Sequence, residues 1–314
     1  MFAVIGLAVV VLLSGAEVKS GVEDFGLLAS GGVGPSFQSG QTAFDQGDYA
    51  QACKWFRIAA DHGDSDAQNN LGLMYSEGKG LPQDYKEAVR WYQLAAEKGN
   101  SEAQYNLGIM SELGHGIQQD YSNAVGWFRL SAAQGNPDAQ LNMGFSYSKG
   151  RGVTQDYVEA MRWYRLAADQ KVTKAQFNLG VMYAEGQGVP QNTVEAIRWY
   201  RMASDGRLPD ASYNLGLIYV KGQGVPKNYF EAAKWFQLSA DQGDAESQAA
   251  LGVLYATGRG VNQDYIEALK WLELAISAGN LKGIEIRDTI LSLMPASAVA
   301  EGRRRAAAFK TVTY

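Results

Sequence analysis

The stretch NLGLMYSEGKGLPQDYKEAVRWYQLAAEKG, residues 70–99, decides the fold because variants of it recur along most of the chain. The seven tryptophans, from Trp55 to Trp271, are spaced at intervals of 36 residues. A glycine recurs at the same interval from Gly72 to Gly252. Because a fixed period of this length is typical of repeat arrays, residues 37–280 are predicted to form one solenoid.

Each repeat is predicted to contain two helices joined by a turn. In residues 66–78, Ala67 and Leu71 begin an apolar pattern at helical spacing, which predicts a first helix. Glycines end this helix, and Asp84 is a suitable N-cap for a second helix over residues 85–99. One hairpin alone cannot bury its tryptophan, which presents about 150–250 Å². The sequence therefore predicts an all-α fold of about seven stacked hairpins.

The N-terminus differs from the array. Residues 1–13 are an apolar run that is too short to span a bilayer comfortably, and the small residues that end at Ala16 suit signal-peptidase cleavage. Residues 1–16 are therefore predicted to be a signal peptide, with an uncleaved membrane anchor as the alternative because no basic residue precedes the apolar run. We expect an exported protein, periplasmic or secreted, or one tethered to a membrane. Residues 17–36 are predicted to be a flexible leader.

Composition argues against several functions. A net charge of −5 and a pI near 5.2 give no reason to expect a nucleic-acid partner. The single cysteine, Cys53, rules out an intrachain disulfide framework and occupies a position that is apolar in the other repeats. The only histidines, His62 and His115, lie in turns where other repeats have residues such as Lys and Gln. We therefore predict no catalytic residue, no metal site and no cofactor.

The repeat motif can be written ALGxxYxxGxGVxxDxxxAxxWYxxAAxxG, as in residues 179–206, LGVMYAEGQGVPQNTVEAIRWYRMASDG. This motif resembles the Sel-1-like repeat family, which is related to tetratricopeptide repeats, over about four fifths of the chain. The resemblance implies a right-handed α/α superhelix that serves as an adaptor or scaffold. The first repeat departs from the motif because residues 46–49 form a shorter link, and residues 281–314 are predicted to be capping helices and a tail.

By analogy with tetratricopeptide units, the first helix of each repeat is expected to line a concave face. An asparagine recurs on these helices, at Asn70, Asn106, Asn142, Asn178 and Asn214. An amide can donate and accept hydrogen bonds, so this row could hold the backbone of an extended peptide. Alternatively, each asparagine bonds a neighbouring repeat and fixes the stacking.

The position before this asparagine varies in size and polarity. In the middle repeats it is aromatic or apolar, and together with Phe145 it predicts an apolar stripe made of Tyr105, Leu141, Phe177 and Tyr213. Exposed apolar stripes often mark interaction sites, and tyrosine is a frequent interface anchor. The alternative is that these side chains only fill the inner groove.

The second helices carry a basic residue in most repeats, usually with a glutamate three residues earlier, as in Glu87 and Arg90. This spacing predicts a solvated outer face with salt bridges. Three further arginines, Arg129, Arg165 and Arg201, make the middle of the array more basic and could form a second docking face. The basic run GRRRAAAFK is predicted to be a solvated helix face, with a site for an acidic partner as the alternative.

The leading functional prediction is a non-enzymatic adaptor that binds a protein or peptide segment in the concave groove and helps to assemble or regulate a cell-envelope complex. The alternative is an obligate structural subunit of a membrane-associated complex, reached through residues 1–13 or a membrane-protein partner. A β-lactamase-like or penicillin-binding enzyme is disfavoured. Relatives described in that way pair cysteines within each repeat, and no Ser-x-x-Lys nucleophile is expected in this array.

Overall fold

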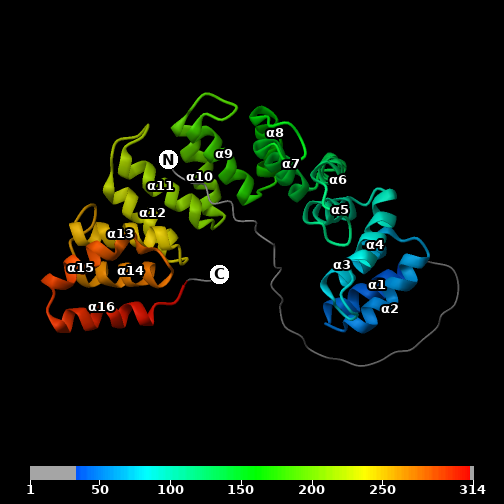
Figure 1. Ribbon diagram of the computed structural model, residues 1–314, viewed down its shortest axis with the longest axis horizontal. Helices are drawn as coiled ribbons and strands as arrows, with labels where there is room; N and C mark the ends of the chain where they lie inside the picture. The colour runs from blue at the N-terminus through cyan, green and yellow to red at the C-terminus, as the bar shows by residue number, and fades with distance from the viewer. Residues whose placement is uncertain (1–32, 312–314) are drawn as a thin grey trace. The chain divides into compact units, whose positions relative to one another are not determined.

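The structure is a computed structural model that describes residues 33–311 (Figure 1). The chain divides into two compact units, Met1–Gln119 (unit 1) and Asp120–Tyr314 (unit 2), and each is described by itself. The predicted signal peptide, residues 1–16, and most of the predicted leader, residues 17–36, lie outside the described residues.

Unit 1 contains five helices in its described part. They are α1 (Val33–Asp45), α2 (Tyr49–Asp61), α3 (Ser65–Glu77), α4 (Tyr85–Glu97) and α5 (Ser101–Leu113). Helix α1 pairs with α2 and α3 with α4, and these hairpins stack through contacts between α2 and α3. The first of these helices begins within the segment assigned to the leader.

Unit 2 contains eleven α-helices and one short 3-10 helix in its described part. The α-helices of the repeats are α6 (Tyr121–Ala133), α7 (Pro137–Lys149), α8 (Tyr157–Asp169), α9 (Thr173–Glu185), α10 (Thr193–Asp205), α11 (Pro209–Lys221), α12 (Tyr229–Ala240), α13 (Ala245–Thr257) and α14 (Tyr265–Ser277). They are followed by η1 (Leu281–Gly283), α15 (Ile284–Leu293) and α16 (Ala296–Ala308). No strand occurs between residues 33 and 311, so the prediction of an all-α hairpin solenoid is confirmed.

The ends of the helices follow the sequence signals. Helix α3 ends at Gly78, which has the left-handed backbone conformation with a φ of 69°, a conformation that glycine adopts without steric cost. Helix α4 begins at Asp84, whose carboxylate accepts hydrogen bonds from the Lys86 and Glu87 amides at 2.9 and 3.1 Å. Both features were predicted, and they recur in most hairpins.

The glycine inside each first helix lets the two helices of a hairpin approach closely. A Cβ atom at Gly72 would lie 2.7 Å from the Tyr92 ring, and one at Gly180 would lie 2.6 Å from the Tyr200 ring. Both tyrosines are buried, so the ring cannot move away without disturbing the core. Glycine at these positions therefore has a packing role.

Buried glutamines link one hairpin to the next. Gln68 donates through Nε2 to the Ala60 carbonyl at 3.0 Å, and Gln176 donates to the Ala168 carbonyl at 3.4 Å. Both glutamines are almost fully buried. Burying an amide is unfavourable unless it is hydrogen-bonded, so these bonds favour the native stacking of one hairpin on the next. This row of glutamines was not predicted from the sequence.

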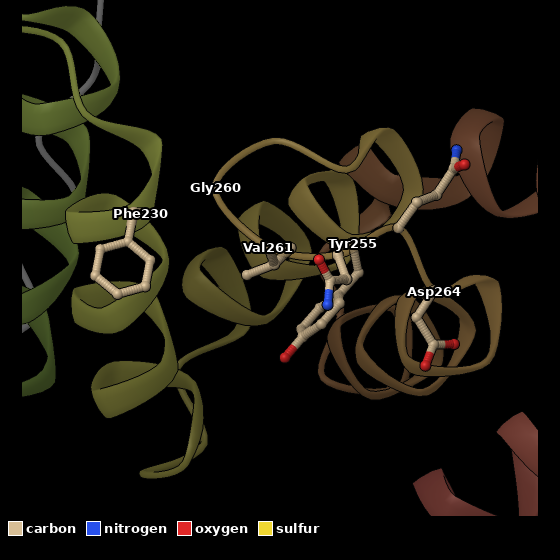
Figure 2. Close-up of a pocket in the computed structure, with 7 residues that line it drawn as sticks. Phe230, Tyr255, Gly260, Val261 and Asp264 are labelled. Carbon is tan, nitrogen blue, oxygen red and sulfur yellow. The ribbon is translucent and has the colours of Figure 1, made fainter.

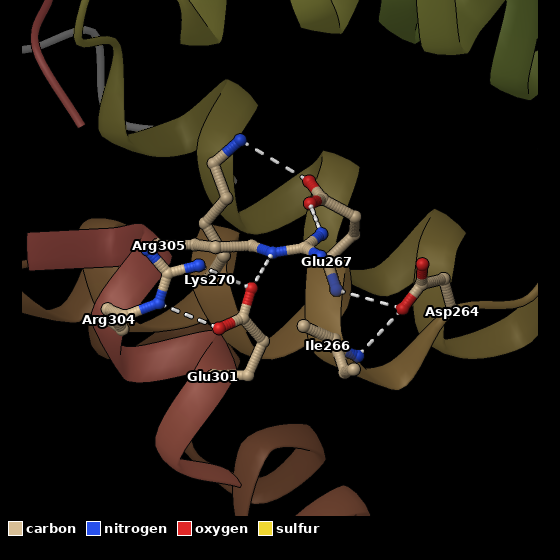
Figure 3. Close-up of polar contacts among 7 residues, drawn as sticks. All are labelled: Asp264, Ile266, Glu267, Lys270, Glu301, Arg304 and Arg305. Carbon is tan, nitrogen blue, oxygen red and sulfur yellow. Dashed lines mark hydrogen bonds and ion pairs between the residues drawn. The ribbon is translucent and has the colours of Figure 1, made fainter. Parts of the chain in front are cut away.

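Helix α16 covers α14 at the C-terminal end of unit 2 (Figure 3). Arg305 donates to Glu267 of α14 at 2.5 Å and to Glu301 of its own helix at 2.7 Å. Gly302 is buried against Leu269. The predicted C-terminal capping helix is confirmed, and the basic run forms its ion pairs within the chain.

None of the helices between residues 33 and 311 combines the length and hydropathy that a membrane-spanning segment requires.

Candidate functional site

The ten residues predicted to bind a partner are divided between the two units. Unit 1 contains Asn70, Tyr105 and Asn106, and unit 2 contains Asn142, Leu141, Phe145, Asn178, Phe177, Asn214 and Tyr213. All ten are half-buried residues of first helices. We call the solvent-exposed side of α7, α9 and α11 the first-helix face of unit 2.

The five asparagines differ in the hydrogen bonds that their side chains make. Asn106 donates through Nδ2 to the Asn69 side chain of the preceding hairpin at 3.0 Å, and Asn214 donates to the Asp210 carbonyl of its own helix at 3.0 Å. Within residues 33–311 the other three side-chain amides have no hydrogen-bond partner, and they belong to Asn70, Asn142 and Asn178. These three amides therefore make no bond between hairpins, whereas the buried glutamines do.

The apolar stripe packs partly onto the core of unit 2. The Phe177 ring lies 5.7 Å from the Tyr200 ring, and the Tyr213 ring lies 5.9 Å from the Phe236 ring. Leu141 packs against the core cluster around α8 and α9. One side of each residue is therefore used in packing, and the remaining side is exposed to solvent.

Tyr213 also forms a polar link to the following hairpin. Its hydroxyl hydrogen-bonds the Glu246 carboxylate, which in turn forms an ion pair with Lys282 at 2.7 Å. Burial, together with the smaller effect of the neighbouring Glu246 and Asp244 carboxylates, raises the pKa of Tyr213 to about 12. The hydroxyl is therefore a neutral hydrogen-bond donor at physiological pH.

Phe145 lies beside a cation of the following turn. The Arg151 guanidinium lies over the Phe145 ring at 5.1 Å from its centroid and over the Tyr121 ring at the same distance. Such contacts orient the guanidinium. Phe145 therefore lies at the border between the first-helix face and the turn after α7.

The second helices form the predicted salt-bridge ladder. Within unit 2 the pairs at a spacing of three residues are Arg162 with Glu159, Arg198 with Glu195, Lys234 with Glu231, and Lys270 with Glu267. The three additional arginines are held by tyrosine hydroxyls of the next hairpin. Arg129 donates to Tyr147, Arg165 to Tyr183 and Arg201 to Tyr219, at 3.4, 2.9 and 3.1 Å.

An open hollow of about 660 Å³ lies between the start of α12 and the turn that joins α13 to α14 (Figure 2). Phe230 forms one wall and the opposite wall includes Tyr255 and Val261. Asn262 and Asp264 complete the rim. This hollow was not predicted from the sequence, although Phe230 occupies a position where the other repeats have smaller or charged residues.

The two histidines and the single cysteine make contacts of the kind that stabilise a fold. His62 contacts the Ile58 carbonyl through Nδ1 at 2.7 Å, and the His115 ring stacks on Tyr85 at 4.5 Å. Cys53 is half-buried, and burial raises the pKa of its thiol. Its side chain packs against the core of the first hairpins. Residues 33–311 contain no cluster of three or more His, Cys, Asp or Glu that could hold a metal ion.

The expectation that the array contains no Ser-x-x-Lys spacing is wrong. Ser146 and Lys149 have this spacing near the end of α7. Ser146 is buried and Lys149 is exposed, and no hydrogen bond joins their side chains in the described part of the chain. An activated serine needs its base within hydrogen-bond reach, so this pair lacks the geometry of a nucleophilic site.

Comparisons with known proteins agree with this architecture. A family model described as the Sel1 repeat matches residues 37–64, 65–100, 101–136, 137–172, 173–207, 209–244 and 245–280. A protective antigen with an SLR fold, present in uropathogenic Escherichia coli, is 37% identical with a TM-score of 0.80, over 89% of this chain and 60% of the antigen. A Sel1 repeat protein from Oxalobacter formigenes is 34% identical with a TM-score of 0.69, over 82% of this chain and 74% of that protein. No curated protein sequence matches the chain.

These features define an α-helical repeat protein built from stacked hairpins. The chain belongs to the Sel1 repeat family. Proteins with Sel1 and tetratricopeptide-like repeats generally serve as scaffolds for protein interactions, and they are typically non-catalytic adaptors. The chain spans about three fifths of the length of the Escherichia coli antigen.

Proposed function

We propose that this protein is an adaptor whose first-helix face in unit 2 binds an extended segment of a partner protein. The observation that carries the proposal is the pair of side-chain amides of Asn142 and Asn178, which are half-buried and have no hydrogen-bond partner between residues 33 and 311. They occupy equivalent positions in consecutive hairpins.

Each amide can pair with both a backbone N–H and a backbone C=O of an extended chain. Leu141 and Phe177 stand beside the two asparagines and offer apolar contact for the partner's side chains. Backbone pairing gives affinity with little dependence on sequence, whereas the apolar contacts give specificity. The bound segment would therefore be extended, with apolar side chains on the side that faces α7 and α9.

The test begins with crosslinking of the full chain in its native host to identify a partner, followed by titration of the purified partner. An Asn142→Ala, Asn178→Ala variant should bind about 5–150-fold more weakly, because one net hydrogen bond lost at each of the two positions costs about 0.5–1.5 kcal/mol. The matched control is Arg162→Ala, Arg198→Ala, which changes exposed residues on the second helices of the same hairpins. An unchanged Kd for the asparagine variant, at equal helicity, would refute the proposal.

We also propose export through cleavage after Ala16 and a role in assembling or regulating a cell-envelope complex. The support is the apolar run of residues 1–13 followed by small residues. Sequencing the N-terminus of the protein recovered from each cell fraction tests this. Protein that retains residues 1–16 in the cytoplasmic fraction would contradict export.

A further inference from the structure

The exposed apolar side chains of this protein are concentrated on one face of unit 2. We define the second-helix face as the solvent-exposed side of α6, α8, α10 and α12. Its large apolar residues are Leu130, Val158, Leu166, Val194, Met202, Phe230 and Leu238. Their exposed fractions range from 38% for Met202 to 65% for Val194. They are most of the exposed large apolar residues in the described part of the chain.

These residues form two parallel rows. On α8, Val158 and Leu166 are eight residues apart, so they lie on the same side of the helix. The same pair recurs on α10 and α12 at intervals of 36 residues, which places equivalent residues on successive hairpins. Single exposed apolar residues are normal, but a contiguous apolar patch marks an interaction surface.

The charges between the two rows are largely neutralised within each helix. Arg162 pairs with Glu159 at 3.0 Å, and Lys234 pairs with Glu231 at 2.8 Å. The Lys234 ammonium also lies 4.3 Å from the centre of the Phe230 ring. The centre of the face therefore has little net charge, which does not favour an anionic membrane or nucleic acid as its occupant.

The edge of the face carries charges of both signs that have no ion-pair partner within residues 33–311. Arg165 and Arg201 are held by neutral tyrosine hydroxyls and contact no carboxylate. Asp169 and Asp205 follow them by four residues, are exposed, and contact no cation. Helices α8 and α10 thus each present an unpaired guanidinium next to an unpaired carboxylate.

We propose that the second-helix face of unit 2 binds the same face of a second copy of this chain. A two-fold interface uses one surface patch twice, so that patch must be complementary to itself. The apolar rows satisfy this requirement because they bury each other. The unpaired arginines of one copy would meet the unpaired aspartates of the other.

The second-helix face borders the hollow beside Phe230 at the start of α12. The two facing walls of the hollow, Phe230 on one side and Tyr255 with Val261 on the other, carry apolar side chains (Figure 2), whereas Asn262 and Asp264 make part of its lining polar. Apolar side chains that enter such hollows at an interface often contribute much of the binding energy.

The test measures the mass of the full chain by sedimentation over a wide range of concentration. One variant, Arg165→Glu with Arg201→Glu, makes the edge of the face acidic. The other, Asp169→Lys with Asp205→Lys, makes it basic. Each alone should raise the dimer Kd at least about tenfold, equivalent to about 1.4 kcal/mol. A mixture of the two should form heterodimers again, because their edges are then complementary.

The matched control is Glu97→Lys, which changes the equivalent position of α4 in unit 1. It should leave the dimer Kd unchanged. For the apolar rows, Leu166→Asp with Met202→Asp should abolish the dimer, whereas Leu113→Asp, an exposed leucine on α5, should not. A dimer formed through residues 1–32 would be equally stable in all of these variants, because none of them changes that segment.

Three results would overturn the proposal. The wild-type chain could remain a monomer at every concentration, or its dimer could survive both charge variants. A monomer that binds vesicles of phosphatidylcholine and phosphatidylglycerol through Leu166 and Met202 would assign the face to lipid instead. None of these results would contradict the proposed binding site on the first-helix face, because the Asn142 and Asn178 variant is tested with a different partner.

Discussion

The second helices of unit 1 and unit 2 share the same interior and differ on their outer side. In unit 1 the positions equivalent to Val158 and Leu166 are occupied by Ala50 and Ile58 on α2 and by Lys86 and Leu94 on α4. Ile58 and Leu94 are half-buried there. The buried positions are shared because stacking requires them, whereas the outer positions are free to differ. Differences on this side therefore indicate binding more directly than the repeated motif does.

The interiors of the two units should respond equally to a cavity. Leu71 in unit 1 and Leu179 in unit 2 are equivalent and fully buried. We expect Leu71→Ala and Leu179→Ala each to lower the free energy of unfolding by about 2–5 kcal/mol. Urea unfolding followed by circular dichroism, with hydrogen exchange to locate the effect, measures this.

The control for the cavity experiment is Leu113→Ala, an exposed leucine on α5 outside the proposed interface, which should change stability by no more than about 0.5 kcal/mol. If the losses of unfolding free energy caused by the two buried substitutions differed by more than about twofold, the interiors of the two units would not be equivalent.

The close approach of paired helices should also be equal in the two units. Gly72→Ala and Gly180→Ala place a methyl group against a buried tyrosine ring, and overpacking of this kind costs about 1–3 kcal/mol. The better helix propensity of alanine offsets this by about 1 kcal/mol. We expect a net destabilisation of up to about 2 kcal/mol in thermal or urea unfolding.

Gly126 on α6 provides the matched control because a Cβ atom there meets nothing within 4 Å. Gly126→Ala should therefore stabilise the chain by about 0.5–1 kcal/mol. Stabilisation by Gly180→Ala as well would show that the close approach does not require glycine.

The hairpins, their caps and the glycine contacts could be predicted because each depends on a local pattern or on the 36-residue period. Links between hairpins were harder to predict. Asn106 and Gln68 belong to two rows of amide side chains that both recur along the first helices. Only the structure shows that the glutamines make the buried hydrogen bonds to the preceding hairpin. The asparagines are mostly not used in this way, which a one-dimensional pattern cannot distinguish.

The outer side was predicted in part. The ladder of glutamate and basic residues was expected from its spacing, and the pair of Glu159 with Arg162 confirms it. The apolar rows were not predicted, although Val158 and Leu166 lie on the side of α8 that carries Arg162 and not on the side of the core residues. The equivalent of Leu166 in unit 1, Leu94, is half-buried, so the exposure of this position depends on the packing of the neighbouring hairpins.

A smaller effect on stability is expected from the hydrogen bonds between arginines of the second helices and tyrosine hydroxyls, which occur in both units. Arg57 donates to Tyr75 in unit 1, and Arg165 donates to Tyr183 in unit 2. Tyr75→Phe and Tyr183→Phe should each cost about 0.5–1.5 kcal/mol of unfolding free energy. If the dimer forms, only Tyr183→Phe should also weaken it, because it releases an arginine at the proposed interface. Equal effects of both substitutions on the dimer Kd would argue against that interface.

The smallest expected effect concerns the cap that unit 2 has at its C-terminal end. Hydrogen bonds from Arg304 and Arg305 lower the pKa of Glu301 to about 2 from an ordinary value of 4.5. Because the folded-state pKa is lowered, the contribution of the carboxylate to stability is complete above about pH 4.5 and is lost as the pH falls towards 2. The group is exposed, so solvent screens much of this contribution.

Hydrogen exchange of α16, compared between the wild type and Glu301→Gln, isolates the contribution of Glu301. The wild type should be better protected above pH 4.5, and the difference should vanish near pH 2, where Glu301 is half protonated or more. Glu285→Gln on α15, whose carboxylate makes no ion pair in the described residues, should show no such pH dependence. Equal protection of wild type and Glu301→Gln at every pH would mean that α16 is held by apolar contacts alone, such as the packing of Phe309 on Trp271.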